Sequence, residues 1–270
     1  MDETALRADM IESLEHRLDR TLGEETLAAL QRVPRETFVP DAPYSNRPSE
    51  VHGSRALAPT TVVRMVSALS PTEGDETLVV GAGVGYTAAI LAEIVGARHV
   101  HAIDIDRELV ALARSNLASA NYDPVLVDRR DGSEGLPEYA PFDRILLEAA
   151  AVRPPRRLLS QLTEDGRLVF PRGTGTQTLV AVRPDRADRT RRTKSADSGG
   201  ASVEGTTGVD GSVRVLEEAG PLQLRPLLAD GERGRIERNR TRREDAELSN
   251  RGYFAKQGWE QEWVNWDDHR

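Results

Sequence analysis

Residues 77–86 read Thr77-Leu78-Val79-Val80-Gly81-Ala82-Gly83-Val84-Gly85-Tyr86. A short apolar run leads directly into three glycines at alternate positions, and a helical pattern follows from Tyr86 to Ile94. The first glycine permits a tight turn, the second lets the backbone approach a ligand, and the last allows the strand and the helix to pack closely. The free N–H groups of the helix N-terminus point to the same place. This stretch therefore predicts a strand, loop and helix that together cradle a ligand.

The spacing of the glycines indicates which ligand. A dinucleotide-binding loop has its third glycine one position later, where this chain has Tyr86, and it meets a pyrophosphate at the helix end. Alternate glycines favour S-adenosylmethionine, which has no phosphate and lays its amino-acid portion against the loop. An ordinary tight turn between a strand and a helix would show the same glycines, so the loop alone does not decide.

A second feature is an acidic residue after the next predicted strand. The strand at 99–103 is followed by Asp104, about 20 residues beyond the glycines, where a carboxylate can accept both hydroxyls of a ribose. Asp104 could instead cap the helix that begins at Arg107, but Asp106 is better placed for that role. We therefore expect Asp104 to bind ribose and Asp106 to cap the helix.

The third feature is Asp131-Gly132, which follows the predicted strand at 125–127. A carboxylate there would reach the exocyclic amine of an adenine, although Asp-Gly is also a common turn. Since the carboxyl ends of parallel strands meet at one edge of a sheet, the glycine loop, Asp104 and Asp131 together predict a nucleoside site at that edge.

The surrounding pattern predicts an α/β fold with a Rossmann-like, doubly wound and mostly parallel sheet, because strand patterns alternate with helical ones. We expect strands at 76–80, 99–103, 125–127, 144–147, 167–170 and 178–182, and helices at 61–69, 86–94, 108–117 and 154–162.

Composition divides the chain further. We expect an N-terminal helical cap and acceptor loop at 1–60, with a helical pattern at 1–32 that ends at Val33-Pro34 and a turn-rich connection at 40–59. An S-adenosylmethionine-binding α/β domain is expected at 61–184, and closing strands at 213–216 and 222–228 within the segment 213–229. A Ser/Gly-rich and charged insertion at 185–212 is too polar to bury a core and is expected to be disordered. A charged extension at 230–270 contains Trp259, Trp263 and Trp266, which we expect to dock on their own chain, a partner-docking face being the alternative.

The composition excludes several classes of protein. The 270 residues contain no cysteine, so disulfides and Cys-ligated metals are excluded, and the five histidines lack metal-ligand spacing, so no metal is expected. No apolar window is long enough to span a membrane, and the N-terminus lacks a secretory pattern, so we expect a cytoplasmic, monomeric protein.

Acidic residues outnumber basic ones, and nearly all of the basic residues are arginine. The chain has 44 acidic and 36 basic residues, and only Lys194 and Lys256 are lysine. A net charge of −8 with almost no lysine suits a halophilic cytoplasm, and GC-rich codon usage is the alternative explanation. Because acidic residues are interleaved with the arginine runs near 189–194 and 233–243, we expect solvated segments and no nucleic-acid binding.

Several stretches share a pattern with one known family, the protein-L-isoaspartate O-methyltransferases, which are class I S-adenosylmethionine enzymes. The resemblance covers roughly 1–183 and the region of Pro226-Leu227-Leu228. The similar stretches are Val33-Pro34-Arg35-Glu36-Thr37-Phe38-Val39-Pro40, Gly81–Tyr86, Asp131-Gly132 with Gly135, Ala140-Pro141-Phe142-Asp143-Arg144-Ile145, Leu159–Leu162, Gly166-Arg167-Leu168 and Pro171.

The resemblance implies an O-methyltransferase that methylates isoaspartyl carboxylates in damaged proteins or peptides, with S-adenosyl-L-methionine as cofactor. It places at the cofactor Gly81, Ala82, Gly83, Gly85, Tyr86, Asp104, Ile105, Asp131 and Gly132.

The acceptor side departs from the family pattern. Where the family has Thr-Ile-Ser-x-Pro-His, this chain reads Arg55-Ala56-Leu57-Ala58-Pro59-Thr60, so Leu57 replaces the acceptor-facing serine and Thr60 replaces the histidine. Leu57 is expected to be non-functional. Ser54, Thr60 and Thr61 are neighbouring hydroxyls that could substitute, and Arg55 could pair with an acceptor carboxylate. The acid that the family has two positions before the first glycine is Val79 here.

Two further readings stay open at this point. The chain could be a class I methyltransferase with a different acceptor, or a non-catalytic relative that binds the cofactor and interacts with partners. A hydride-transferring oxidoreductase is disfavoured by the glycine spacing.

Overall fold

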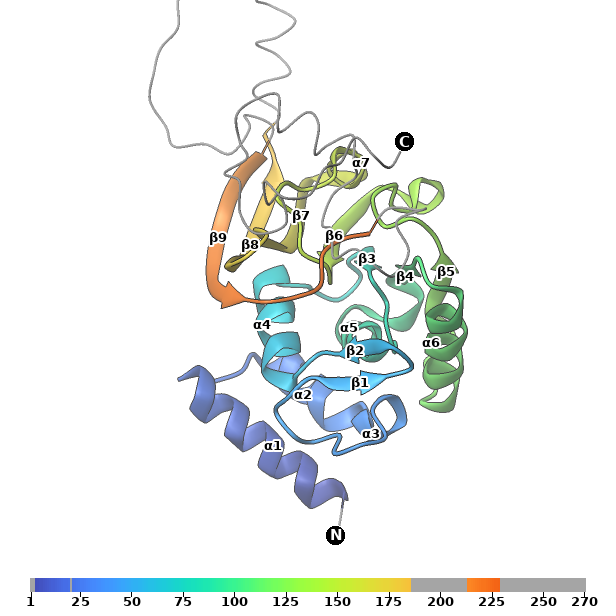
Figure 1. The fold of residues 1–270 in the computed structure, drawn as a ribbon, viewed down its shortest axis with the longest axis vertical. Helices are drawn as coiled ribbons and strands as arrows, with labels where there is room; N and C mark the ends of the chain where they lie inside the picture. Colours follow the sequence, from blue (N-terminus) through green and yellow to red (C-terminus); the bar gives the residue numbers. More distant parts are fainter. Residues whose placement is uncertain (1–2, 20, 186–212, 229–270) are drawn as a thin grey trace, which may run out of the picture.

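The computed structural model describes residues 3–19, 21–185 and 213–228, and its centre is a seven-stranded sheet (Figure 1). The strand order is β5-β4-β3-β6-β7-β8-β9, with the first five parallel and β8 and β9 antiparallel to their neighbours. This confirms the predicted fold class. The strands are β3 (Thr77–Val80), β4 (Val100–Asp104), β5 (Leu126–Arg129), β6 (Phe142–Leu147), β7 (Leu162–Arg172), β8 (Gln177–Pro184) and β9 (Val213–Leu222).

Helices cover both faces of the sheet. α4 packs beneath β6 to β9, α5 and α6 pack beneath β3 to β5, and α7 packs near β7 and β8 on the opposite face. The bounds are α1 (Glu3–Leu18), α2 (Glu24–Arg32), α3 (Arg35–Phe38), α4 (Pro59–Leu69), α5 (Tyr86–Val95), α6 (Arg107–Ser119), α7 (Arg156–Ser160), and the 3-10 turns η1 (Ala97–His99) and η2 (Pro137–Tyr139).

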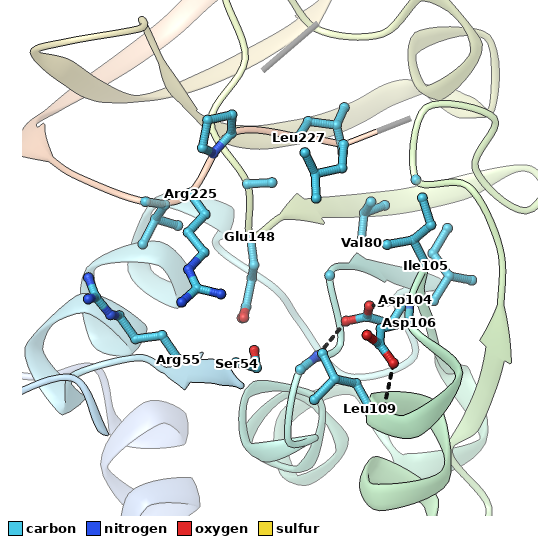
Figure 2. A pocket seen from close by; sticks show the side chains of 18 of the residues that line it. Ser54, Arg55, Val80, Asp104, Ile105, Asp106, Leu109, Glu148, Arg225 and Leu227 are labelled. Carbon is cyan, nitrogen blue, oxygen red and sulfur yellow. Dashed lines mark hydrogen bonds between the residues drawn. The ribbon is translucent and has the colours of Figure 1, made fainter. Parts of the chain in front are cut away.

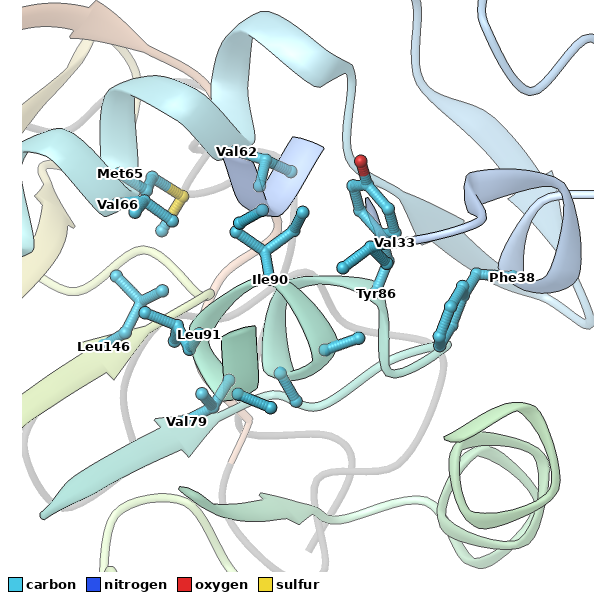
Figure 3. Packing of buried hydrophobic residues seen from close by; sticks show 14 of the residues in the cluster. Val33, Phe38, Val62, Met65, Val66, Val79, Tyr86, Ile90, Leu91 and Leu146 are labelled. Carbon is cyan, nitrogen blue, oxygen red and sulfur yellow. The ribbon is translucent and has the colours of Figure 1, made fainter. Parts of the chain in front are cut away.

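The apolar run that opens the glycine loop is buried on both of its faces. Val79 joins Leu146 in the cluster beneath α4 and α5 (Figure 3). Leu78 and Val80 belong to the cluster on the opposite face. A strand covered on both sides has no polar face, which is why β3 reads as a continuous apolar run.

The N-terminal cap consists of α1, α2 and α3, followed by a small hairpin of β1 (Ser49–Val51) and β2 (Ser54–Ala56). The helical pattern at 1–32 is divided after Leu18, and Asp19 has a positive φ of 48°. Val33, the residue before Pro34, is extended, so α2 ends there as the sequence predicts. The hairpin lies within the segment that was expected only to contain turns.

Two predictions near the end of the domain are wrong: one helix is shorter than predicted, and one strand does not form. The predicted helix at 154–162 is only α7, because Pro155 starts it and β7 already begins at Leu162. The second closing strand at 222–228 does not form: β9 ends at Leu222, and the side chain of Gln177 bonds both the N–H and the carbonyl of Leu224, which turns the chain away from the ladder.

Residues 223–228 instead cross the carboxyl edge of the sheet and touch it through one bridge between Pro226 and Ala150. Nearly all of the predicted insertion at 185–212, and the predicted extension at 230–270 with its three tryptophans, lie outside the described residues. Within the described ranges, no helix is long and apolar enough to cross a membrane.

The turn after β5 supplies a test of the fold. Gly135 has φ +67°, and a Cβ there would lie 2.4 Å from Oε1 of Gln161. The Gln161 amide cannot move freely, because it accepts the Leu136 N–H at 2.8 Å and donates to the Glu134 carbonyl at 2.8 Å. We expect Gly135→Ala to lower the free energy of unfolding by about 2–4 kcal/mol in denaturant titration.

The matched control is Gly175→Ala, where an added Cβ would meet nothing within 4 Å. That variant should stay within about 0.5 kcal/mol of the parent protein. Equal stability of the two variants would contradict the packing described around Gln161.

Candidate functional site

A cavity of about 680 Å³ opens at the carboxyl ends of β3, β4 and β6 (Figure 2). This is the place where the strand order changes direction, since β4 and β5 lie on one side of β3 and β6 and β7 on the other. Open α/β sheets bind ligands at such a switch point. The hairpin β1–β2 and the segment 223–228 form its other walls.

The glycine loop forms the floor of the cavity. Gly81, Gly83 and Gly85 have φ values of +92°, +52° and +91°, a region that other residues rarely adopt. The N–H groups of Gly81 and Ala82 both donate to the carbonyl of Ile103, at 2.8 and 2.9 Å, which anchors the loop to β4. A Cβ on Gly85 would lie 3.3 Å from the Leu117 side chain, so the last glycine allows close packing against α6, whereas the sequence predicted packing between the strand and the helix that follows the loop.

Asp104 stands beside the loop at the end of β4. Its carboxylate accepts the N–H of Gly83 at 2.9 Å and the N–H of Asp106 at 3.0 Å. A carboxylate offers about four acceptor positions, so Asp104 keeps acceptor capacity for the hydroxyls of a ribose. Burial raises the pKa of Asp104, and the backbone N–H bonds oppose that rise. Asp106 caps α6 through the Glu108 N–H at 2.7 Å, which confirms the role predicted for it.

Seven of the residues predicted for the site line this one cavity: Arg55, Leu57, Gly81, Gly83, Asp104, Ile105 and Gly132. Five do not line it: Thr60, Ala82, Gly85, Tyr86 and Asp131.

The side chain of Asp131 and the backbone of Thr60 serve local structure, and the Thr60 hydroxyl is buried without a hydrogen-bond partner among the described residues. Asp131 accepts the N–H and the hydroxyl of Ser133 at 2.8 and 2.7 Å, which is the turn geometry that the sequence left open as the alternative. The Thr60 N–H donates to Oδ1 of Asn46 at 3.0 Å, at the start of α4. Gly132 lines the cavity, and it must be glycine because a Cβ there would lie only 2.6 Å from the Val80 side chain.

Tyr86 points away from the cavity into the N-terminal cap. It is 3% exposed, and the guanidinium of Arg35 lies 4.4 Å over its ring. Arg35 also donates to the carbonyl of Pro43 at 2.7 Å and to the carbonyl of Leu57 at 2.6 Å. Burial lowers the pKa of Arg35, and Tyr86 opposes that shift. Arg35 thus joins α3, the acceptor loop and the helix after the glycine loop.

The acceptor side of the cavity is cationic at its mouth. Arg55 donates to Glu50 at 3.1 Å, and Arg225 lies 3.7 Å from the other oxygen of the same carboxylate. Arg225 also donates to the carbonyl of Gly53 at 3.0 Å. Leu57 and Ser54 line the cavity between these groups. Arg225 was not predicted, because the strand expected at 222–228 gave no reason to place it here.

Sequence reasoning also missed Glu148, which immediately follows β6. Its N–H donates to the Val80 carbonyl at 2.8 Å, and its side chain enters the cavity beside the glycine loop (Figure 2). Burial raises the pKa of Glu148 to about 7, opposed by a hydrogen bond from Thr87 and reinforced by the charge of Asp104. An acid after an apolar strand was the signal used for Asp104, and it would have found Glu148 too.

Among the described residues, no group of three or more His, Asp or Glu side chains could hold a metal ion. His99 and His101 both face Glu76, with nitrogen–oxygen distances of 2.7 and 3.5 Å.

The chain is similar to proteins of one enzyme family. A family model described as Protein-L-isoaspartate(D-aspartate) O-methyltransferase matches residues 7–198. The chain belongs to this family. Among its curated relatives, the protein-L-isoaspartate O-methyltransferase of Methanosarcina mazei is 38% identical over 198 residues, 71% of this chain and 80% of the relative. The enzyme of that name from Aeropyrum pernix is 42% identical over 197 residues, 69% of this chain and 75% of the relative.

Solved structures agree on the fold. A protein-L-isoaspartate O-methyltransferase superposes with a TM-score of 0.59 at 23% identity, over 65% of this chain and 59% of the other. A Plasmodium falciparum protein, described as a protein-L-isoaspartate O-methyltransferase in complex with S-adenosyl-L-homocysteine, has a TM-score of 0.58 at 21% identity, over 65% and 88% of the two chains. The family model and the curated relatives thus confirm the resemblance that the sequence shows to this methyltransferase family.

The contacts of Arg35 generate a second prediction. Arg35→Met keeps an unbranched apolar stem but leaves the partly buried carbonyls of Pro43 and Leu57 without this donor, so we expect about 2–4 kcal/mol less stability. The segment 43–57 should also be cut faster by a protease at low concentration. Arg32→Met, which removes only a surface pair with Glu93, should change stability by less than about 0.5 kcal/mol. Equal effects of the two variants would contradict the linking role of Arg35.

Proposed function

We propose that this protein transfers a methyl group from S-adenosyl-L-methionine to the free carboxylate of L-isoaspartyl residues in damaged proteins or peptides. One observation supports this most directly. This chain belongs to the isoaspartate methyltransferase family, and its glycine loop and Asp104 line one side of a single cavity. Arg55 and Arg225 line the opposite side of the same cavity, at its mouth.

The residues present fit the cofactor. Gly81 and Gly83 leave the loop backbone open, and Asp104 keeps acceptor positions for a ribose. Ile105 and Gly132 line the space where an adenine would lie, while Ala82, Gly85, Tyr86 and Asp131 shape the loops from outside the cavity. When bound, S-adenosylmethionine supplies an electrophilic methyl group on a positively charged sulfur.

The chain's own task toward the acceptor is to position it. A carboxylate of ordinary pKa is already ionised at neutral pH, so no side chain has to remove a proton. Arg55 and Arg225 would attract and orient the acceptor carboxylate, and in-line positioning is worth up to about 7–11 kcal/mol in favourable systems. Of the hydroxyls near the substituted Leu57, Ser54 lines the cavity and is the one placed to replace the family's serine.

We further propose that the protein acts as a monomer in the cytoplasm and binds neither nucleic acid nor membrane, as its sequence suggests. Light scattering after size exclusion tests the first of these. The alternative functions are a class I methyltransferase with another acceptor, which Leu57 and Thr60 favour, and a cofactor-binding protein without activity.

One assay separates these alternatives. We expect an isoaspartyl peptide to be methylated from radiolabelled S-adenosylmethionine, with an identical aspartyl peptide unlabelled. Activity should increase from about 0.1 to about 3 M KCl if the acidic, lysine-poor chain is halophilic. Binding of the cofactor without labelling of either peptide would leave only the other two functions.

Asp104 gives the corresponding test of the cofactor site. Asp104→Asn removes the charge that strengthens two ribose hydrogen bonds, so the Kd for S-adenosylmethionine should increase about 10- to 100-fold in calorimetry. Asp131→Asn, whose side chain faces Ser133, should change that Kd by less than about threefold. Similar losses for the two variants would contradict the assignment of ribose to Asp104.

Arg55 gives the test of the acceptor side. Arg55→Ala should increase the KM for the isoaspartyl peptide about tenfold and leave the KM for S-adenosylmethionine unchanged, since Arg55 lies at the mouth beside Glu50. The control is Arg98→Ala, on η1 and outside the residues that line the cavity. Unchanged peptide kinetics in Arg55→Ala would remove Arg55 from the site.

A further inference from the structure

Glu148 is a partly buried carboxylate that lines this cavity, and the proposed function assigns it no role. It lies directly beside the glycine loop, since a Cβ on Gly81 would be 3.5 Å from the Cβ of Glu148. Thr87, in the first turn of α5, hydrogen-bonds its side chain. The second oxygen, Oε1, is shielded from solvent and has no hydrogen-bond partner. Glu148 therefore presents an unused acceptor inside the cavity.

The described residues supply no cation to this carboxylate. Within the described part of the chain, Glu148 forms no ion pair, and Arg55 and Arg225 at the mouth both face Glu50. Burying an unpaired carboxylate costs free energy, and the group then holds a proton more tightly. A cationic ligand group would offset that cost by pairing with Oε1.

The two carboxylates of the cavity lie on opposite sides of the glycine loop. Asp104 follows β4, and Glu148 follows β6, with β3 and its loop between them (Figure 2). S-adenosylmethionine has an adenosine at one end and an amino acid, with a permanent ammonium group, at the other. A ligand whose ribose lies at Asp104 and whose chain crosses the loop brings its amino-acid end to the side of Glu148.

We propose that Glu148 binds the ammonium group at the amino-acid end of the cofactor. This inference rests on the proposed function for the identity of the cofactor. The strand β3 cannot supply a carboxylate to the ammonium group, because Thr77–Val80 is buried and contains no acidic residue. Glu148 is thus a cofactor-binding residue, and it sets a pH dependence of cofactor affinity.

The sign of that dependence follows from the two states of Glu148. Only the ionised form pairs with an ammonium group, and below pH 7 the group is increasingly protonated in the free protein. Affinity for S-adenosylhomocysteine should therefore fall about tenfold from about pH 8 to about pH 6. The other charged or titratable groups lining the cavity are His52, Arg55, Asp104, Asp106, Arg107, Glu108 and Arg225.

The test is calorimetric titration of the full chain with two probes. S-adenosylhomocysteine has the ammonium group, whereas 5′-methylthioadenosine keeps the adenosine and the sulfur but lacks the amino acid. We expect Glu148→Gln to weaken S-adenosylhomocysteine binding at least about tenfold at about pH 8, to leave 5′-methylthioadenosine binding unchanged, and to abolish most of the pH dependence. Glu73→Gln, an exposed charge remote from the cavity, should change neither Kd.

Thermal unfolding gives a readout independent of ligands. The pKa of Glu148 is higher in the folded than in the unfolded chain, so the carboxylate destabilises the fold progressively as the pH rises from about 4.5 to about 7, and fully above that. Glu148→Gln should therefore melt at the same or a higher temperature than the parent protein at about pH 8. A lower melting temperature would contradict an unpaired Glu148.

The outcomes are distinguishable. Equal S-adenosylhomocysteine affinity in the parent and Glu148→Gln overturns this inference and leaves the proposed function intact. An equal loss for both probes shows a general disturbance of the cavity and overturns it too. In a third titration of Glu148→Gln, with S-adenosylmethionine, a loss of affinity that S-adenosylhomocysteine does not share would assign Glu148 to the sulfonium and overturn the ammonium assignment. A parent protein that binds neither S-adenosylmethionine nor S-adenosylhomocysteine would refute the proposed function itself.

Discussion

The buried guanidinium of Arg35 is the interaction on which the arrangement of the cavity depends. Its charge is held by the carbonyls of Pro43 and Leu57 and by the face of Tyr86, and no described carboxylate pairs with it. Because Tyr86 begins α5, the contact ties the acceptor loop to the helix that follows the glycine loop. Burying a cation costs free energy unless several hydrogen-bond partners surround it at once. The N-terminal cap can therefore take few other positions without losing these partners. Arg35 thereby fixes the position of the acceptor loop relative to the glycine loop, although the two are far apart in the sequence.

Features that depend on local sequence were predictable. The glycine loop needs positive φ at Gly81, Gly83 and Gly85, which only glycine adopts freely, so the sequence states the turn directly. The same holds for Asp106, whose carboxylate bonds N–H groups two and three residues later. Asp104 could be placed at the cavity because parallel strands end at one edge of the sheet.

Features that depend on distant contacts were not predictable from local patterns. Tyr86 follows the glycine loop in sequence, yet its side chain is drawn away by Arg35, some fifty positions earlier in the chain. Residues 223–228 have the apolar composition of a strand, but the amide of Gln177 captures the backbone of Leu224 and redirects the segment over the cavity. That redirection is what brings Arg225 to the mouth.

Asp104 and Glu148 show why two carboxylates at equivalent places in the fold can bind different ligand groups. Both follow buried strands at the carboxyl edge, but Asp104 receives two backbone N–H bonds, whereas Glu148 receives one from Thr87 and keeps a free oxygen. Backbone donors stabilise the charge of Asp104 before any ligand arrives, so its remaining acceptor positions suit neutral hydroxyls. Glu148 lacks that support, and its ionised form gains most from a positive charge. The number of N–H and O–H groups that donate to each carboxylate thus decides which end of the ligand it binds. Asp104, with more donors, suits the ribose, and Glu148, with fewer, suits the ammonium group.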